Sequence, residues 1–238
     1  MPPTIVLVHG AFAESASWDR VIDPLLRAGH PVIAAANPLR GLASDAAAVS
    51  DIVRSVDGPV VLVGHSYGGA VISNVAADAG EIAGLVYVNG FAPDAGEHCF
   101  QLAGMFPGSR LGEETAWPVS RSDGTTDFYV AADSFHDVFC QDVSAQSATR
   151  MCATQRPATQ EALTEPSGDS PLWKSVPSWF CIGEEDRVIP PALQRYMAER
   201  ARAQHTRAVE GASHAITVSR PDECLHPILE AAAMRVAA

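Results

Sequence analysis

The sequence predicts one α/β domain with a mainly parallel central sheet of about six strands, flanked by helices. Two observations predict this fold class. Short apolar runs alternate with helix-length amphipathic segments, which is typical of βαβ units. The runs are also apolar at nearly every position, as expected of strands that are buried on both faces. A chain of 238 residues is long enough for one large domain with an insertion.

Six segments fit the strand pattern, and they lie at residues 5–8, 31–36, 60–63, 84–89, 176–183 and 206–210. Helices are predicted between and after them, at residues 18–26, 44–56, 69–76, 192–203 and 221–236. Ser15 or Ser17 is expected to cap the first helix and Gly29 to end it. Two prolines precede the helix at 192–203, a position that suits proline.

The alternation stops between about Pro93 and Pro171. This stretch is rich in proline, glycine, serine and aromatic residues, and it is too long for a structureless loop inside a compact domain. We therefore expect a small, partly helical subdomain. The predicted organisation is a core formed by residues 1–92 and 172–238, with residues 93–171 inserted as a lid before the last two strands.

Composition excludes several classes of partner. The formal net charge of −12 argues against nucleic acid and against an anionic membrane surface. No apolar run is long enough to span a membrane, and the N-terminus shows no signal peptide. The five cysteines are scattered, without the spacing of a zinc site, which indicates free thiols in a reducing compartment. We expect a cytoplasmic protein that uses no metal or other cofactor.

The most informative motif is Gly64-His65-Ser66-Tyr67-Gly68, which joins a buried strand to a helix. A sharp turn at this point holds the serine in a strained backbone conformation and raises its hydroxyl above the edge of the sheet. The alternative is a glycine-rich turn in which Ser66 only caps the helix. The position of the motif, between a strand and a helix, favours a nucleophile.

Two further polar residues follow later strands. Asp186 comes after the strand at 176–183, and His214 comes after the strand at 206–210. The carboxyl ends of parallel strands line one edge of a sheet, so Ser66, Asp186 and His214 can meet there. A serine hydroxyl needs a base, and an acid behind the histidine would orient that base. Glu184, Glu185 and Asp94 are the alternative acids.

These motifs resemble landmarks of the α/β-hydrolase superfamily over essentially the whole chain. The matching stretches are Val8–Phe12, Gly64–Gly69, Gly183–Pro190 and Gly211–His214. In detail, the chain is most similar to small, lid-bearing serine esterases grouped with plant methyl-ester esterases and hydroxynitrile lyases. The resemblance implies a catalytic triad of Ser66, Asp186 and His214.

The resemblance also implies an oxyanion hole formed by the backbone N–H groups of Phe12 and Tyr67. His9 and His65 are expected to hydrogen-bond backbone near this region. Phe12 is alternatively a core residue beneath the lid. The residues expected to line the substrate site are Phe12, Tyr67, Phe91, Met105, Phe106, Trp117 and Phe135.

The nucleophile narrows the reaction class. Related dehalogenases and epoxide hydrolases carry an aspartate where this chain has Ser66, and related hydroxynitrile lyases carry a threonine and a lysine where it has Gly10 and Ala215. Hydrolysis of an ester, thioester or lactone of a small, moderately hydrophobic substrate is therefore expected. A lactonase, cyclase or C–C bond hydrolase, and a ligand receptor on the same scaffold, are the alternatives. A homodimer is an alternative to a monomer.

Overall fold

The computed structural model describes residues 1–234, and its central sheet has six strands. They are β1 (Thr4–Val8), β2 (Val32–Ala35), β3 (Val60–His65), β4 (Ile82–Val88), β8 (Ser178–Gly183) and β9 (His205–Val209). The strand order is β2-β1-β3-β4-β8-β9, and every neighbouring pair is parallel. The predicted fold class is confirmed.

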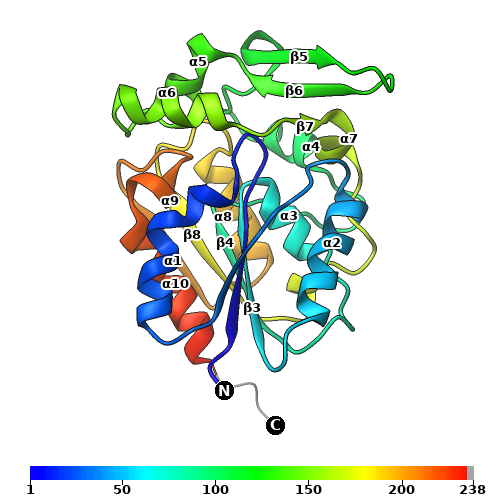
Figure 1. Ribbon diagram of the computed structural model, residues 1–238, viewed down its shortest axis with the longest axis vertical. Helices are drawn as coiled ribbons and strands as arrows, with labels where there is room; N and C mark the ends of the chain where they lie inside the picture. Colours follow the sequence, from blue (N-terminus) through cyan, green and yellow to red (C-terminus); the bar gives the residue numbers. More distant parts are fainter. Residues whose placement is uncertain (235–238) are drawn as a thin grey trace.

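Helices cover both faces of this sheet (Figure 1). One face carries α1 (Asp19–Arg27), α9 (Ile216–Ser219) and α10 (Pro221–Ala233). The other face carries α2 (Leu42–Arg54), α3 (Tyr67–Ser73) and α8 (Pro191–Arg200). Successive side chains of a strand point to opposite faces, so Ile5 and Leu7 join one buried core and Val6 and Val8 the other. This explains why the inner strands β1 and β3 are apolar at most positions, whereas the edge strand β9 is polar and mostly exposed.

The helix boundaries differ in places from those predicted. A short 3-10 helix, η1 (Ser15–Trp18), precedes α1, and no serine side chain caps either helix. Ser15 instead donates its hydroxyl hydrogen to the carbonyl of Ala35 at 3.1 Å, so the capping prediction was wrong. Helix α8 ends at Arg200, because Arg202 adopts a left-handed conformation with φ +50°. The predicted end of the last helix, at residue 236, lies outside the described residues.

Residues 93–171 contain both helices and strands. The helices are α4 (Cys99–Ala103), α5 (Ala132–Phe139), α6 (Ala145–Thr154) and α7 (Gln160–Thr164), with the 3-10 helix η2 (Glu113–Thr115); a further one, η3 (Leu172–Lys174), follows the segment. The strands β5 (Ala116–Ser120), β6 (Thr126–Val130) and β7 (Ala158–Thr159) form an antiparallel sheet that sequence analysis did not predict. The turn between β5 and β6 uses Gly124 at φ +86°.

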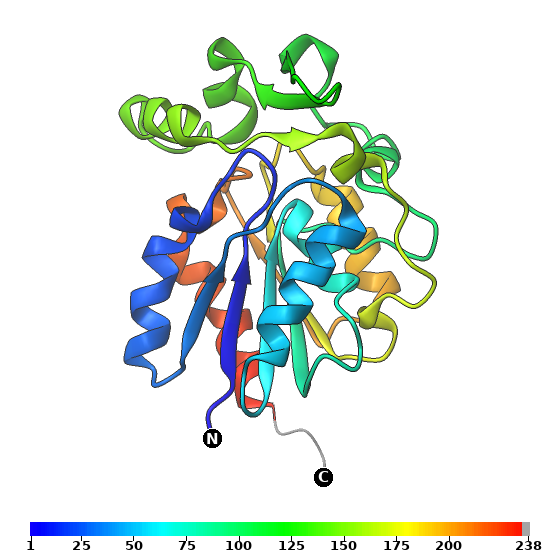
Figure 2. The same cartoon turned by 45° about the vertical axis from the view of Figure 1, so that its right-hand side comes forward.

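This segment, which we call the lid, lies across the carboxyl edge of the central sheet. Both views show it as a separate layer above the strand ends, with the N-terminus at the opposite end of the molecule (Figures 1 and 2).

The five cysteines are free thiols. Within residues 1–234, no helix is long and apolar enough to cross a membrane.

Helix α3 packs very closely on the sheet. A Cβ atom added to Gly68 would lie 2.3 Å from the carbonyl oxygen of Val8, and one added to Gly69 would lie 2.4 Å from that of Phe91. Both neighbours are backbone atoms in buried segments, so they have little freedom to move aside. Gly68 therefore fixes how closely α3 approaches β1, and Gly69 fixes how closely it approaches the segment after β4.

We expect Gly68→Ala to lower the free energy of unfolding by about 3 kcal/mol or more, because the added methyl group forces the backbone apart. Urea denaturation measures this change. Gly104→Ala is the matched control, since a Cβ at Gly104 meets its nearest neighbour at 3.5 Å, an ordinary contact. Equal stability of the two variants would contradict this account of the packing.

Candidate active site

Ser66 lies at the junction of β3 and α3 in a strained conformation. Its φ is +56° and its ψ is −126°, values that residues with side chains rarely adopt. Its backbone N–H donates to the carbonyl of Asn89 at 3.1 Å, which holds the turn in place. The loop that contains Gly10 passes directly over it, since a Cβ at Gly10 would lie 3.0 Å from the Ser66 hydroxyl oxygen. The local geometry is that of a nucleophile elbow.

Asp186 and His214 form a buried pair. Nδ1 of His214 lies 2.8 Å from Oδ2 of Asp186, and the side chains of both are fully buried. The remaining donors to the carboxylate are the backbone N–H groups of Val188 and Ile189, at 2.8 and 2.9 Å, and Nε2 of Gln194, at 2.9 Å. These donors fix the orientation of the carboxylate, and it in turn fixes the imidazole ring.

The other ring nitrogen of His214, Nε2, is buried and has no hydrogen-bond partner among the described residues. It is therefore available to exchange a proton. The alternative acids lie elsewhere: Glu184 pairs with Arg195, Asp94 pairs with Lys174, and Glu185 is exposed. Of the four candidates, Asp186 is the one that the structure brings to the histidine.

Asn89, which follows β4, was missed by sequence analysis. Its Nδ2 donates to the carbonyls of Ser213 and His214 at 2.9 and 3.2 Å, and its Oδ1 accepts the N–H of Gly183 at 2.6 Å. Together with its bond to the Ser66 N–H, these contacts tie together the segments at the carboxyl ends of β3, β4, β8 and β9. The sequence did carry a signal for this role, because Asn89 is a polar residue directly after the buried strand β4.

The predicted backbone contacts of His9 and His65 are present. Nε2 of His65 lies 2.9 Å from the carbonyl of His214, and Nδ1 of His9 lies 2.9 Å from that of Gly10. Burial lowers the pKa of His9 to about 4, and burial together with the nearby His214 lowers the pKa of His65 to about 3. Both side chains are therefore neutral near pH 7, which fits a role in positioning loops.

The oxyanion prediction needs a correction at Phe12. Its φ is +61°, and its N–H donates to the carbonyl of Arg156, in the lid, at 3.0 Å. This N–H is therefore not free to bind another oxygen. The N–H groups of Ala11 and Tyr67, by contrast, have no acceptor among the described residues. Ala11 follows Gly10 in the loop that passes over Ser66, and Tyr67 directly follows Ser66. Ala11 replaces Phe12 as the candidate donor.

The structure brings only some of the predicted pocket residues to the site. Phe91 donates its N–H to the Ser66 carbonyl at 3.1 Å, and Tyr67 is adjacent to Ser66. Phe135 stacks on Phe139, whose ring meets His214 edge-on at 4.8 Å between centroids. Phe139 was not predicted, although it lies one helical turn after Phe135 on the same face of α5.

Met105 and Trp117 are not brought to the site. They are 47% and 56% exposed. Trp117 lies on β5, at the outer edge of the lid sheet, where its ring packs against Tyr129. Phe106 is half-buried against Tyr196 of α8. The aromatic content of the lid was visible in the sequence, but the direction of each side chain depended on a sheet that was not predicted.

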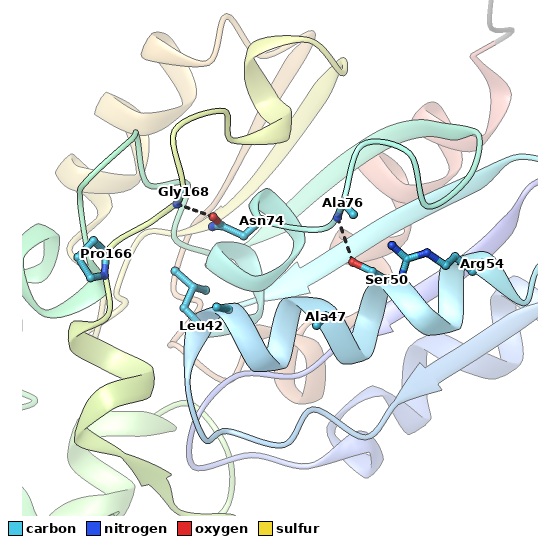
Figure 3. Close-up of a pocket in the computed structure, with 9 residues that line it drawn as sticks. Leu42, Ala47, Ser50, Arg54, Asn74, Ala76, Pro166 and Gly168 are labelled. Atoms are coloured by element: carbon cyan, nitrogen blue, oxygen red, sulfur yellow. Dashed lines mark hydrogen bonds between the residues drawn. The ribbon is translucent and has the colours of Figure 1, made fainter.

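A surface groove of about 380 Å³ lies away from Ser66, between α2, the end of α3 and the loop at 166–168 (Figure 3). Its lining includes Ser50, whose hydroxyl accepts the Ala76 N–H, and Asn74, whose side chain accepts the Gly168 N–H. Arg54 at its edge pairs with Asp51 and Asp78. These polar groups already have partners, so the groove offers no reactive centre.

The lowered pKa values predict acid sensitivity. The unfolded chain takes up protons on His9 and His65 near pH 6.5, whereas the folded protein does so only near pH 4 and 3. The free energy of unfolding should therefore fall as the pH drops below 6.5, by up to about 1.4 kcal/mol per pH unit for each histidine. Urea denaturation between pH 7 and pH 4 measures this loss.

Replacing one of these histidines should reduce the effect. In His65→Gln the loss of stability with falling pH should be smaller, whereas His226→Gln, at an exposed position, should leave it unchanged. An identical pH dependence in His65→Gln and the unaltered protein would show that His65 is not held neutral by burial.

Comparison with known proteins shows the family to which this chain belongs. A pyrethroid hydrolase from Sphingobium wenxiniae is 28% identical over 242 residues, covering 95% of this chain and 86% of the relative. A carbendazim hydrolyzing esterase from Nocardioides sp. is 34% identical over 110 residues, covering 41% of this chain and 46% of the relative. The crystal structure of polyneuridine aldehyde esterase superposes with a TM-score of 0.80 at 18% identity, covering 97% and 99% of the two chains. The model of the alpha/beta hydrolase family matches residues 5–226, and the chain therefore belongs to this family.

Proposed function

We propose that this protein is a serine hydrolase that cleaves a carboxylic ester of a small, moderately hydrophobic substrate through an acyl-enzyme. The observation that carries the proposal is the buried Asp186–His214 pair, which leaves Nε2 of His214 without a partner at the edge where Ser66 stands. Asn89 links the turn of Ser66 to the loop of His214 through hydrogen bonds, which supports the assignment of the three residues to one site. Such an arrangement is the usual means of activating a serine hydroxyl.

In the proposed reaction, Ser66 Oγ attacks the ester carbonyl while Nε2 of His214 takes the hydroxyl proton. Asp186 stabilises the positive charge that forms on the imidazole ring. The carbon–oxygen bond to the alcohol then breaks, and the alcohol leaves with the proton from His214. Water next attacks the acyl-enzyme, again giving a proton to His214, and the acid is released as Ser66 regains its hydroxyl hydrogen.

Negative charge develops on the carbonyl oxygen during both attacks. The N–H groups of Ala11 and Tyr67 are the donors we assign to it, because neither has another acceptor among the described residues. A donor aimed in advance at the oxyanion typically lowers the barrier by about 2.7–4 kcal/mol. Both donors belong to the backbone, so their side chains are free to shape the site.

The lid restricts which substrates reach Ser66. Ser66 is 4% exposed and His214 is wholly buried, so a substrate enters only when part of the lid moves aside. A lid residue that contacts the histidine ring is the aromatic Phe139, which favours an apolar acyl or alcohol group. Two relatives are named as a pyrethroid hydrolase and a carbendazim hydrolyzing esterase, which supports a small organic ester or ester-like substrate.

We expect a fluorophosphonate to label Ser66 and Ser66→Ala to lose both labelling and hydrolysis of p-nitrophenyl butyrate. His214→Ala should lower kcat/KM by at least about a thousandfold, because the hydroxyl then lacks its base. Mass spectrometry of the labelled peptide and steady-state kinetics measure the two effects. His205→Ala, which removes an exposed histidine paired with Glu230, is the matched control.

Labelling at another residue, or full activity without His214, would overturn the proposal. A folded protein that binds small esters without turning them over would instead favour a receptor. If simple esters are turned over slowly, product analysis with lactones and diketones separates ester hydrolysis from lactonase and C–C bond hydrolase activity.

A further inference from the structure

Asp45 is a buried carboxylate that the proposed reaction does not use. It lies in the first turns of α2 and is 0% exposed. Its carboxylate forms no ion pair of its own among the described residues: it accepts the N–H of Arg40 at 3.1 and 3.2 Å and the phenol of Tyr67 at 2.8 Å. Burying a carboxylate without a cation costs free energy, so the presence of one at this position points to a specific role for Asp45.

The partner of Asp45 is the residue directly after the candidate nucleophile. The Tyr67 ring is buried beneath the lid, and its phenol donates its hydrogen to Oδ2 of Asp45. Tyr67 is also the first residue of α3, and its backbone N–H is one of the two proposed oxyanion donors. The phenol of Tyr67 is therefore held by α2, while its backbone N–H lies next to Ser66.

We propose that Asp45 is a positioning residue: by holding the Tyr67 phenol, it fixes the direction of the Tyr67 backbone N–H beside Ser66. This inference rests on the proposed hydrolase function and adds to it a residue from a helix that bears no member of the triad. A small error in the direction of an oxyanion donor weakens its bond to the transition state more than it weakens substrate binding.

The carboxylate is itself held in a fixed orientation. The loop before α2 supplies the Arg40 N–H, and the lid holds this loop from the other side. The Arg40 guanidinium binds Asp127 of β6 at 2.5 Å and the carbonyl of Pro157 at 2.8 Å, and the Thr159 hydroxyl donates to the Arg40 carbonyl at 2.8 Å. Asp45 is thus placed between the lid and the nucleophile turn.

A purely structural role for Asp45 would be to satisfy the backbone at the start of α2. The Arg40 N–H bonds serve that purpose, but they do not require Tyr67 to carry a hydroxyl group. Replacing Tyr67 by phenylalanine removes the bond to Asp45 and leaves the helix start intact. Tyr87→Phe is the matched control, because Tyr87 is also fully buried and its phenol also bonds a residue of α3, Ser73, at 2.8 Å.

The experiment measures kcat and KM for p-nitrophenyl butyrate, together with the rate of fluorophosphonate labelling, in Tyr67→Phe, Asp45→Asn, the double variant and Tyr87→Phe. We expect Tyr67→Phe to lower kcat and the labelling rate by about ten- to a hundredfold, with KM within about twofold. Tyr87→Phe should keep the original kcat. The double variant should be no slower than the slower single variant, because the two residues act through one bond.

The outcomes separate this inference from the proposed function. If the unaltered protein neither hydrolyses esters nor reacts with the fluorophosphonate, the function is wrong and the inference falls with it. If the unaltered protein is active and Tyr67→Phe matches it in kcat, only the inference is overturned. A rise in KM alone, or an equal loss in Tyr87→Phe, also overturns it. Should Asp45→Asn not fold, Tyr67→Phe and Tyr87→Phe still decide.

Discussion

The candidate site depends on the side-chain amide of Asn89. Strands β3, β4, β8 and β9 each end in a turn or loop, and the parallel ladder alone does not fix where those segments point. Asn89 accepts the N–H of Gly183 and donates to the carbonyls of Ser213 and His214, while its own carbonyl accepts the Ser66 N–H. These backbone groups are buried and need hydrogen-bond partners. Because Asn89 supplies those partners from one position, the loops are held in one arrangement. Asn89 thereby links the Ser66 turn to the end of β8, just before Asp186, and to the loop that carries His214.

The core of the fold could be predicted because its signal is local and repeated. Runs such as Val60–Val63 are apolar on both faces, and each is followed by an amphipathic segment and a turn. The positions of Ser66, Asp186 and His214 follow from the same logic, since a polar residue in the turn or loop after a parallel strand lies at the carboxyl edge of the sheet. Asn89 obeys this rule as well, but an amide suggests no chemistry of its own and was passed over.

The lid could not be predicted in this way. Its strands are short and mixed in character, as Trp117 and Pro118 in β5 illustrate. The pairing of β6 with β7 also joins residues that are distant in sequence, such as Asp127 and Thr159. Its contacts with the core decide details that propensity does not encode. The Phe12 N–H, expected to bind substrate, binds the Arg156 carbonyl instead, because the lid chain passes over the loop at that point. Where the lid meets the core, tertiary contacts override local pattern.

These two regions meet at the turn that contains Ser66. Its left-handed conformation is unfavourable by itself, so the surrounding structure must hold it. Three contacts restrain this turn. At the end of β4, the carbonyl of Asn89 accepts the Ser66 N–H, and at β1 the close packing of Gly68 limits movement. On the α2 side, Tyr67 donates a hydrogen bond to Asp45. The hydrogen bond between Tyr67 and Asp45 is connected to the lid through Arg40, which donates its N–H to Asp45 and binds Asp127 and Pro157 of the lid. A substrate that displaces the lid would therefore change the support of the same turn on which its own reaction depends.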